Sequence, residues 1–165
     1  MKYAFFYIGD HLFGIPIFLV QEISRPTAIH PIPGHDNRIE GLVNLRGRTA
    51  VVINMHQCIY GTTSPGGKGL RRKLIILETS DGLPPEAIEL GIQAYEEPLV
   101  LIVDDMYKIS SGEKEQYFPP PAHVNELYVD GIMKLEDRLM TLISVPRLIE
   151  DIVALSEGDF NEDGK

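Results

Sequence analysis

The sequence predicts an all-β protein made of two packed five-stranded β-barrels, with a short helix in the first half and a second helix near the C-terminal end. Two observations carry this prediction. The apolar residues fall into short runs rich in branched and aromatic side chains, and turn-forming glycines and prolines separate these runs. A hairpin-plus-helix pattern also occurs twice, so each half supplies about five short strands, which suits a small barrel better than a wide sheet.

The first copy of this pattern lies at residues 41–59. Two β-type apolar runs flank Arg46-Gly47-Arg48, which we interpret as the turn of a hairpin. Glycine adopts a positive φ without penalty, so the turn pivots on its glycine and directs both arginines towards solvent. Asn54 is a favourable N-cap for a short helix over residues 55–60, and Gly61 ends that helix.

The second copy lies at residues 131–149. The pairs that are identical when it is aligned with residues 41–59 are Gly41/Gly131, Leu45/Leu135, Arg48/Arg138, Ile53/Ile143 and Ile59/Ile149. The N-cap Asn54 coincides with Ser144, and residues 99–109 can be aligned with residues 13–23. The sequence therefore predicts two repeat units, near residues 3–61 and 88–150, inside one domain over residues 1–156.

Other apolar runs complete the predicted barrels. In the first half, strands are expected at residues 3–8 and 12–20, the latter continuing to residue 23. In the second half, residues 88–95 are expected to pair with residues 99–106. The alternative partner of 99–106 is the apolar run at residues 74–77, which would make residues 80–97 an inserted excursion.

The C-terminal part of the chain changes character twice. An apolar stripe and Pro146 in the first turn predict a helix over residues 145–156. Residues 157–165 are acidic and poor in apolar side chains, so we expect a disordered tail.

The composition excludes several classes of protein. The net charge of −9 disfavours a nucleic-acid partner, because phosphate binding depends on clustered lysines and arginines. The single cysteine, Cys58, excludes an internal disulfide and favours a reducing compartment. We find neither a signal peptide nor a run of about 18 apolar residues. We therefore expect a cytoplasmic protein that does not insert into a membrane.

No group of residues predicts catalysis, a cofactor or a metal site. The candidate metal ligands are His30, His35, His56 and Cys58. They lack the short repeated spacing of a structural zinc site. Gly66-Gly67-Lys68-Gly69 lacks the spacing of a phosphate-binding P-loop, and we interpret it as a loose hairpin loop. The sequence therefore predicts a protein that is not an enzyme and acts through its surfaces.

Three stretches of the first half follow one another in a recognisable order. They are Phe13-Gly-Ile-Pro-Ile-Phe-Leu-Val-Gln-Glu-Ile23, Pro31-Ile-Pro33 and Gly41-Leu-Val-Asn-Leu-Arg-Gly47. Their order and spacing resemble the CheW-like domain family of bacterial chemotaxis adaptors. In that family a strand ending in Val-x-Glu-Ile precedes a proline-containing connection and a Gly-Val-x-Asn-Leu-Arg-Gly hairpin. Ile102-Val-Asp-Asp105 and residues 131–145 also resemble its later strands.

The resemblance implies a fold and a function. The fold would be two intertwined SH3-like five-stranded barrels without catalytic activity. The protein would be a scaffold that joins the cytoplasmic tip of methyl-accepting chemoreceptors to the regulatory domain of a CheA-type histidine kinase. Recruitment to membrane receptor arrays would then occur through these partners.

The resemblance further implies a receptor-binding groove on the first barrel. Matching positions give the expected site residues Ile17, Val20, Glu22, Ile23, Arg46, Leu74 and Ile75. The isoleucines and Val20 would receive apolar side chains of a receptor helix, while Glu22 and Arg46 would fix its register at the rim. No residues are assigned to contact with the kinase.

Each of these residues also has a structural interpretation. Ile17, Ile23 and Ile75 can be ordinary core, and Glu22 can be a solvated strand end. Arg46 can instead bridge the two barrels, because a guanidinium offers five donors in a fixed fork.

Two departures from the family pattern leave the function more open. Residues 51–55 replace the proline and the Asp-Leu pair that usually follow the turn, and about a dozen extra residues lie between residues 77 and 99. A pilus or surface-sensing paralogue that engages a single partner therefore stays open. So does a general peptide-binding SH3-like interaction module.

Overall fold

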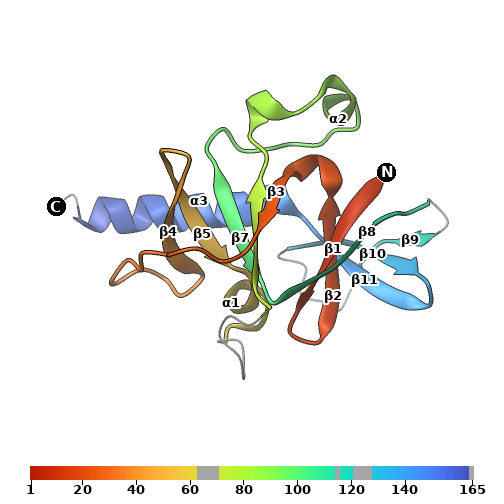
Figure 1. The fold of residues 1–165 in the computed structure, drawn as a ribbon, viewed down its shortest axis with the longest axis horizontal. Coiled ribbons are helices and arrows are strands. Elements are labelled where there is room, and N and C mark those ends of the chain that lie inside the picture. Colours follow the sequence, from red (N-terminus) through yellow and green to blue (C-terminus); the bar gives the residue numbers. More distant parts are fainter. Residues whose placement is uncertain (63–70, 114–115, 121–127, 164–165) are drawn as a thin grey trace.

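The strands form two sheets (Figure 1). The structure, a computed structural model, describes residues 1–62, 71–113, 116–120 and 128–163, with side chains as far as Leu155. The first sheet has the order β3 (Val20–Ser24), β6 (Lys73–Leu77), β7 (Leu99–Val103), β5 (Arg48–Asn54), β4 (Ile39–Leu45). The second sheet has the order β8 (Asp105–Ser111), β1 (Lys2–Ile8), β2 (His11–Pro16), β11 (Arg138–Ile143), β10 (Val129–Leu135), β9 (Tyr117–Phe118).

Short helices connect the strands, and one long helix ends the chain. The helical segments are η1 (Ile17–Leu19), α1 (Met55–Tyr60), η2 (Ser80–Gly82), α2 (Pro85–Glu89) and α3 (Val145–Asp163). Both predicted hairpins are confirmed, and each leads directly into a helix, β5 into α1 and β11 into α3. The predicted caps of α1 are also present, because Asn54 accepts a hydrogen bond from Gln57 N and Gly61 is left-handed. The glycine-rich run at Gly66-Gly67-Lys68-Gly69 lies outside the described residues.

Each sheet takes strands from both halves of the chain. In the second sheet, β1 pairs with β8 and β2 pairs with β11. In the first sheet, β3 pairs with β6 and β5 pairs with β7. The expected repeat units near residues 3–61 and 88–150 therefore do not form one sheet each. Strand periodicity fixes which face of a strand is buried but does not identify its partner. The sequence pattern therefore could not predict that the two halves exchange strands.

The strands that the two halves exchange are paired in the register that the two internal sequence alignments predict. Val51 of β5 lies opposite Leu99 of β7 in a parallel pair, and Thr141 of β11 lies opposite Phe13 of β2 in another. The hairpin alignment relates residue 51 to 141, and the strand alignment relates residue 99 to 13. The two sheets are thus built on the same pairing plan.

Neither sheet closes into a barrel by backbone pairing among the described residues. β3 and β4 remain the edges of the first sheet, and β8 and β9 those of the second. The predicted five-stranded barrels are therefore two open SH3-like sheets. The two residues of β9 add a sixth strand to the second sheet.

The predicted strand at residues 88–95 is wrong, and the alternative is right. β6 is the antiparallel partner of β7, so residues 80–98 form an excursion that stands out from the sheets (Figure 1). Pro85 lies in the first turn of α2, where its missing N–H costs nothing, and Gly91 with a φ of 79° follows the helix. Ala87 anchors α2 because its side chain is fully buried.

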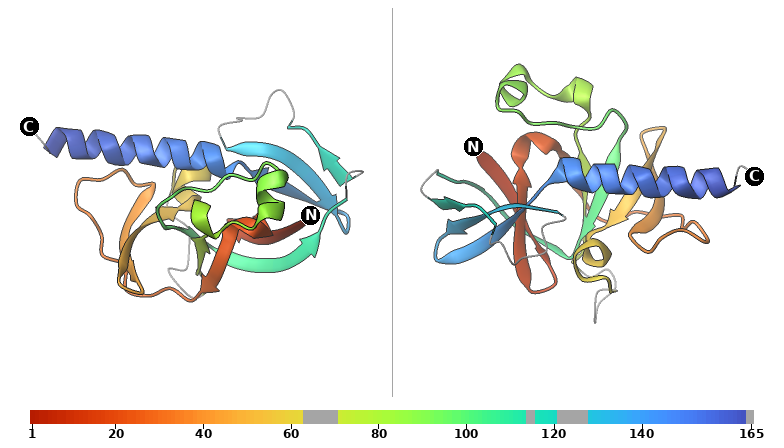
Figure 2. Two further views of the ribbon diagram at one scale, coloured as in Figure 1. Left: turned by 90° about the horizontal axis from the view of Figure 1, so that it is seen from above. Right: turned by 180° about the vertical axis from the view of Figure 1, so that it is seen from behind.

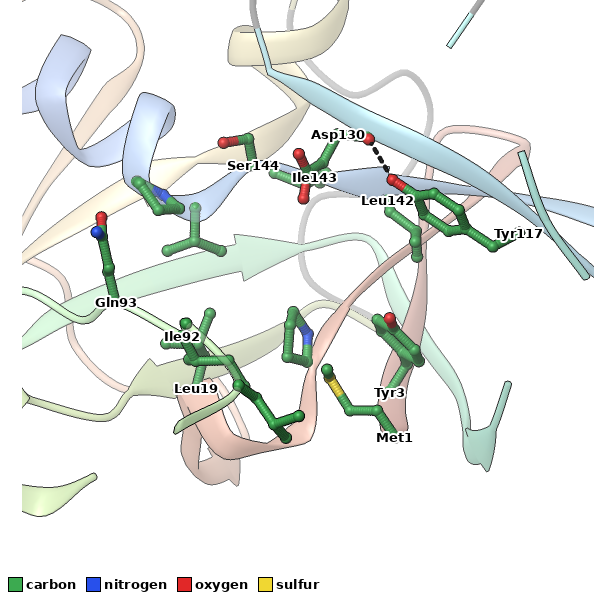
Figure 3. A pocket seen from close by; sticks show the side chains of 15 residues that line it. Met1, Tyr3, Leu19, Ile92, Gln93, Tyr117, Asp130, Leu142, Ile143 and Ser144 are labelled. Atoms are coloured by element: carbon green, nitrogen blue, oxygen red, sulfur yellow. Dashed lines mark hydrogen bonds between the residues drawn. The ribbon is translucent and has the colours of Figure 1, made fainter. Parts of the chain in front are cut away.

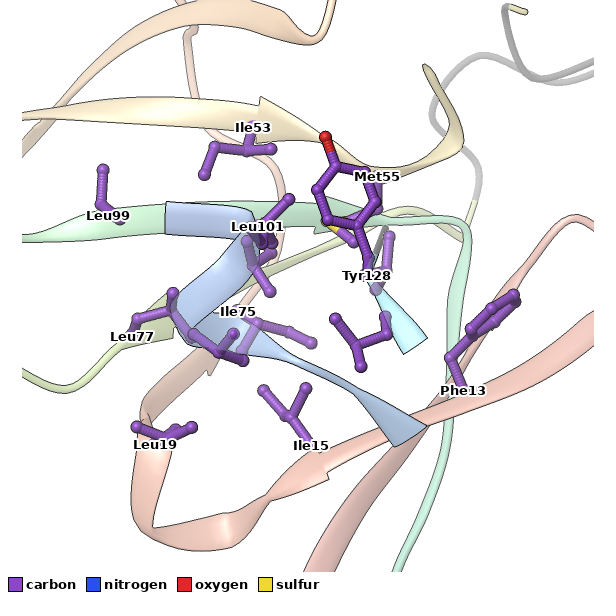
Figure 4. Close-up of a cluster of buried hydrophobic side chains, with 14 of the residues drawn as sticks. Phe13, Ile15, Leu19, Ile53, Met55, Ile75, Leu77, Leu99, Leu101 and Tyr128 are labelled. Atoms are coloured by element: carbon purple, nitrogen blue, oxygen red, sulfur yellow. The ribbon is translucent and has the colours of Figure 1, made fainter. Parts of the chain in front are cut away.

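Three apolar clusters hold the fold together. The largest lies between the sheets and α3, and includes Ile15, Ile53, Ile75 and Leu101 (Figure 4). A second cluster belongs to the first sheet and contains Val43, Ala50, Val52, Leu74, Ile76, Val100 and Ile102. The third belongs to the second sheet and contains Phe5, Leu12, Met133, Leu135, Met140 and Leu142. The two sheets therefore share one apolar core, and each sheet also has a smaller core of its own.

Helix α3 crosses the first sheet, and its C-terminal end projects beyond it (Figure 2). Leu148, Ile149 and Ile152 bury the predicted stripe in the shared core. The helix continues to Asp163, so the expected disordered tail is helical up to that residue. Adding a residue to an existing helix costs far less than starting one, so an acidic segment of low apolar content can continue a helix that is already anchored. No helix among the described residues is long and apolar enough to cross a membrane.

Candidate functional site

The two edge strands of the first sheet meet at a charged pair. Arg46 lies in the turn between β4 and β5, and its Nη2 is 3.1 Å from Oε2 of Glu22 in β3. Because β3 and β4 are the two edges of the sheet, this pair bridges its open side. We call the surface formed by Ile17, Val20, Glu22, Ile23 and Arg46 the first seam.

The turn presents Arg46 to solvent. Arg46 and Gly47 have φ values of 50° and 85°, and Asn44 Oδ1 accepts a hydrogen bond of 3.0 Å from Gly47 N. The Arg46 side chain is 85% exposed, so it does not bridge the two sheets as the structural interpretation required. An ion pair this exposed contributes at most about 1 kcal/mol to folding, and both charges remain accessible to a partner.

A β-bulge places the apolar side chains of the first seam together. Val20 pairs with Leu77 and Ile23 with Ile75, and the register shifts between Val20 and Glu22. The extra residue breaks the alternation of the strand, so Val20 and Ile23 lie on one face although three positions separate them. Both are half-buried, as is Ile17 in η1, while Glu22 is exposed. Ile17 and Val20 pack against the shared core, whereas Glu22 lies opposite Ile76, on the other face of β3.

Two of the expected site residues do not reach the surface. Leu74 and Ile75 are fully buried, the first in the cluster of the first sheet and the second in the shared core. β6 lies between β3 and β7, and both of its faces are covered. The prediction that Leu74 and Ile75 line the groove is therefore wrong. They support the first seam from beneath.

Of the candidate histidines and the cysteine in the described part of the chain, His56 and Cys58 are held in structural surroundings. His56 is buried, and its Nδ1 lies 2.9 Å from Oδ2 of Asp104, which also accepts a 2.6 Å hydrogen bond from Gly9 N. These contacts tie α1 to the β1–β2 turn. Burial raises the pKa of Cys58 to about 12, so its thiol is protonated at neutral pH and is a poor nucleophile. Among the described residues, no group of three potential ligands is placed to hold a metal ion.

Sequence reasoning missed a polar network that fastens α3. The guanidinium of Arg38 donates to both oxygens of Asp36 and, at 2.8 Å, to Asp151 Oδ2 in α3, while the Tyr128 hydroxyl donates to the same Asp151 oxygen. The hydrogen bonds from Arg38 lower the pKa of Asp36. Burial, followed by the contact with Asp151, raises the pKa of Tyr128 to about 12.

Comparison with known proteins identifies the family. A model of the CheW-like domain matches residues 2–153. The chain belongs to this family. A chemotaxis protein CheW from Treponema pallidum (strain Nichols) is 24% identical over 148 residues, which cover 87% of this chain and 78% of that protein. The crystal structure of the scaffolding protein TtCheW from Thermoanaerobacter tengcongensis superimposes with a TM-score of 0.70 and 27% identity, over 86% of this chain and 87% of that one.

The CheW-like fold of this chain carries a second seam with inverted charges. Nζ of Lys108 in β8 lies 2.6 Å from Oε1 of Glu136, in the turn between β10 and β11. The hairpin alignment relates residue 46 to 136, and the strand alignment relates residue 22 to 108. The arginine–glutamate pair of the first sheet thus corresponds to a glutamate–lysine pair in the second. The two alignments, taken together, contained the signal for this pair.

Proposed function

We propose that this protein is a non-catalytic adaptor that couples methyl-accepting chemoreceptors to a CheA-type histidine kinase in bacterial chemotaxis or a related signalling pathway. The observation that carries this proposal is the match to the CheW-like domain over residues 2–153. The solved relative, which is a scaffolding protein, supports it. The protein would reach receptor arrays through its partners, without inserting into the membrane.

The first seam is the proposed receptor-binding surface. The half-buried side chains of Ile17, Val20 and Ile23 offer an apolar strip to the tip of a receptor helix. The Glu22–Arg46 pair lies at the open side of the sheet, with Glu22 on the opposite face of β3, and would fix the register of the helix through charge complementarity. The kinase regulatory domain would bind a separate surface, so that both partners are held at once.

Co-sedimentation tests the bridging role. The protein is mixed with a receptor cytoplasmic fragment and a CheA regulatory domain, separately and together, and a ternary complex is expected. Arg46→Glu should weaken receptor binding at least about tenfold while leaving kinase binding unchanged. The matched control is Glu136→Arg, which breaks the corresponding ion pair of the second seam and should leave receptor binding unchanged.

Two outcomes would contradict the proposal. Binding of the receptor fragment that is equal in wild type and Arg46→Glu would remove the first seam from the receptor site. Failure to bind the kinase domain, together with binding of unrelated extended peptides, would indicate a general peptide-binding module.

A further inference from the structure

A cavity of about 280 Å³ opens beside the excursion at residues 80–98 (Figure 3). The apolar walls come from Leu90 and Ile92 in the excursion, Leu19 in η1, Ile143 at the end of β11 and Val145 at the start of α3. Figure 3 shows Leu19 and Ile92 facing Ile143 across the opening. The cavity is large enough to receive a side chain from another molecule.

The mouth of this cavity exposes large apolar side chains. Met1, Leu90 and Tyr117 all line it, and Leu90 is 53% exposed. Contiguous exposed apolar residues around a concave opening are characteristic of sites that bind another molecule. The mouth is therefore suited to a protein segment that covers the rim as well as entering the cavity.

The polar groups around the cavity favour a cation. Asp130 lines the cavity, and among the residues that the structure describes no lysine, arginine or histidine lines it. α2 leads directly into Leu90 and carries exposed Glu86 and Glu89; neither these two carboxylates nor Asp130 forms an ion pair with other described residues.

Two tyrosines reinforce this preference. Tyr117 donates a 2.8 Å hydrogen bond to the backbone oxygen of Asp130, and Tyr3 lines the same cavity. Burial, followed by the neighbouring Tyr117 and Asp130, raises the pKa of Tyr3, so its ring stays neutral in the cavity wall. Aromatic faces also attract lysine and arginine side chains.

We propose that the excursion builds a second docking site, which takes a partner segment that inserts an apolar side chain and places lysine or arginine beside Asp130, Glu86 and Glu89. This site does not depend on the proposed receptor function. It uses none of the five residues of the first seam, although Leu19 in its wall adjoins Val20 in the chain.

Binding of defined peptides to the full chain tests the site. Three fluorescent peptides of about five helical turns are compared by anisotropy: an amphipathic leucine–lysine helix, a scrambled peptide of the same composition, and an amphipathic leucine–glutamate helix. The amphipathic leucine–lysine peptide should bind best, with NMR shift changes at Leu90, Ile92 and Tyr117. Leu90→Glu and Asp130→Lys should each weaken this binding at least about tenfold.

The matched control is Leu139→Glu, which adds the same charge at a leucine that is 65% exposed on β11. It should bind the peptide as wild type does, and so should Arg46→Glu. Equal binding of amphipathic and scrambled peptides, or equal losses in Leu90→Glu and Leu139→Glu, would reduce the effect to net charge and overturn the proposal. Self-association of the wild type that Leu90→Glu abolishes would also overturn it, in favour of a second copy as the occupant.

Discussion

The two seams occupy corresponding places in the two sheets and carry opposite charges. In the first, a turn arginine meets a strand glutamate, whereas in the second a turn glutamate, Glu136, meets a strand lysine, Lys108. The bulge is repeated as well, since β1 and β8 shift register as β3 and β6 do. The pairing plan has therefore been kept in both sheets while the surface chemistry has diverged. Shared geometry alone does not make the two seams equivalent for a partner.

The surroundings of the second seam differ further. The ring of Tyr107 lies 5.5 Å from Lys108 Nζ and 5.1 Å from the guanidinium carbon of Arg138, and it packs edge-on against Tyr7. The Tyr107 position corresponds to Gln21 of the first sheet. The second seam thus packs its cations on tyrosines, whereas the first leaves Arg46 in solvent.

The largest expected difference between the two sheets concerns their paired glycines. A Cβ at Gly41 would meet the backbone oxygen of His30 at 2.3 Å, whereas at Gly131 it would meet the ring of Tyr117 at 2.6 Å. A backbone cannot move aside as a partly exposed ring can. Gly41→Ala should therefore lower the free energy of unfolding by about 3 kcal/mol and Gly131→Ala by about 1 kcal/mol. Urea denaturation measures both, and equal losses would contradict this reading of the two positions.

The second prediction concerns α3, the helix that follows the second hairpin. α3 is anchored by Arg38 through Asp151, so Arg38→Met should destabilise the fold by about 2 kcal/mol at neutral pH. Asp36 has a lowered pKa in the folded state, so its contribution is present above the ordinary carboxyl pKa and is lost as pH falls through the lowered value. Wild type should therefore lose stability below about pH 4 more steeply than the variant. Parallel pH profiles from thermal denaturation would disprove this.

The smallest effects are expected from the two seam ion pairs. Double-mutant cycles on Glu22/Arg46 and on Lys108/Glu136, with alanine as the replacement, should each give a coupling energy below about 1 kcal/mol, because at least one side chain of each pair is well exposed. A coupling energy of several kcal/mol in either cycle would show that the pair holds its sheet together.

Local features of the fold could be predicted from the sequence, whereas the long-range ones could not. Asn54 and Gly61 mark the ends of α1 as expected, since caps depend on neighbouring residues alone. The exchange of β1 and β2 with β6 and β7 depends on which distant strands meet, and apolar alternation carries no information about that. The strand expected at residues 88–95 is wrong because Pro84 and Pro85 start α2, which takes in Ile88 and Glu89, and Gly91 with its positive φ follows the helix.

The candidate site likewise contains features that the sequence could predict and features that it could not. Glu22 and Arg46 were expected together at the rim of a receptor-binding groove; they form an ion pair, and their role in that groove stays a prediction. Leu74 and Ile75 belong to an apolar run without alternation, which is typical of a strand covered on both faces, so the sequence already contained the signal for their burial. The Arg38 network could not be predicted, because its members come together only when α3 packs against the first sheet.

One variant tests the central claim most directly. Glu22→Lys combined with Arg46→Glu gives the first seam the charge order of the second and preserves an ion pair. We expect a thermal denaturation midpoint close to that of wild type and receptor-fragment binding weakened at least about tenfold in isothermal titration calorimetry. Receptor binding at the wild-type affinity, in a double variant that is fully folded, would contradict that claim.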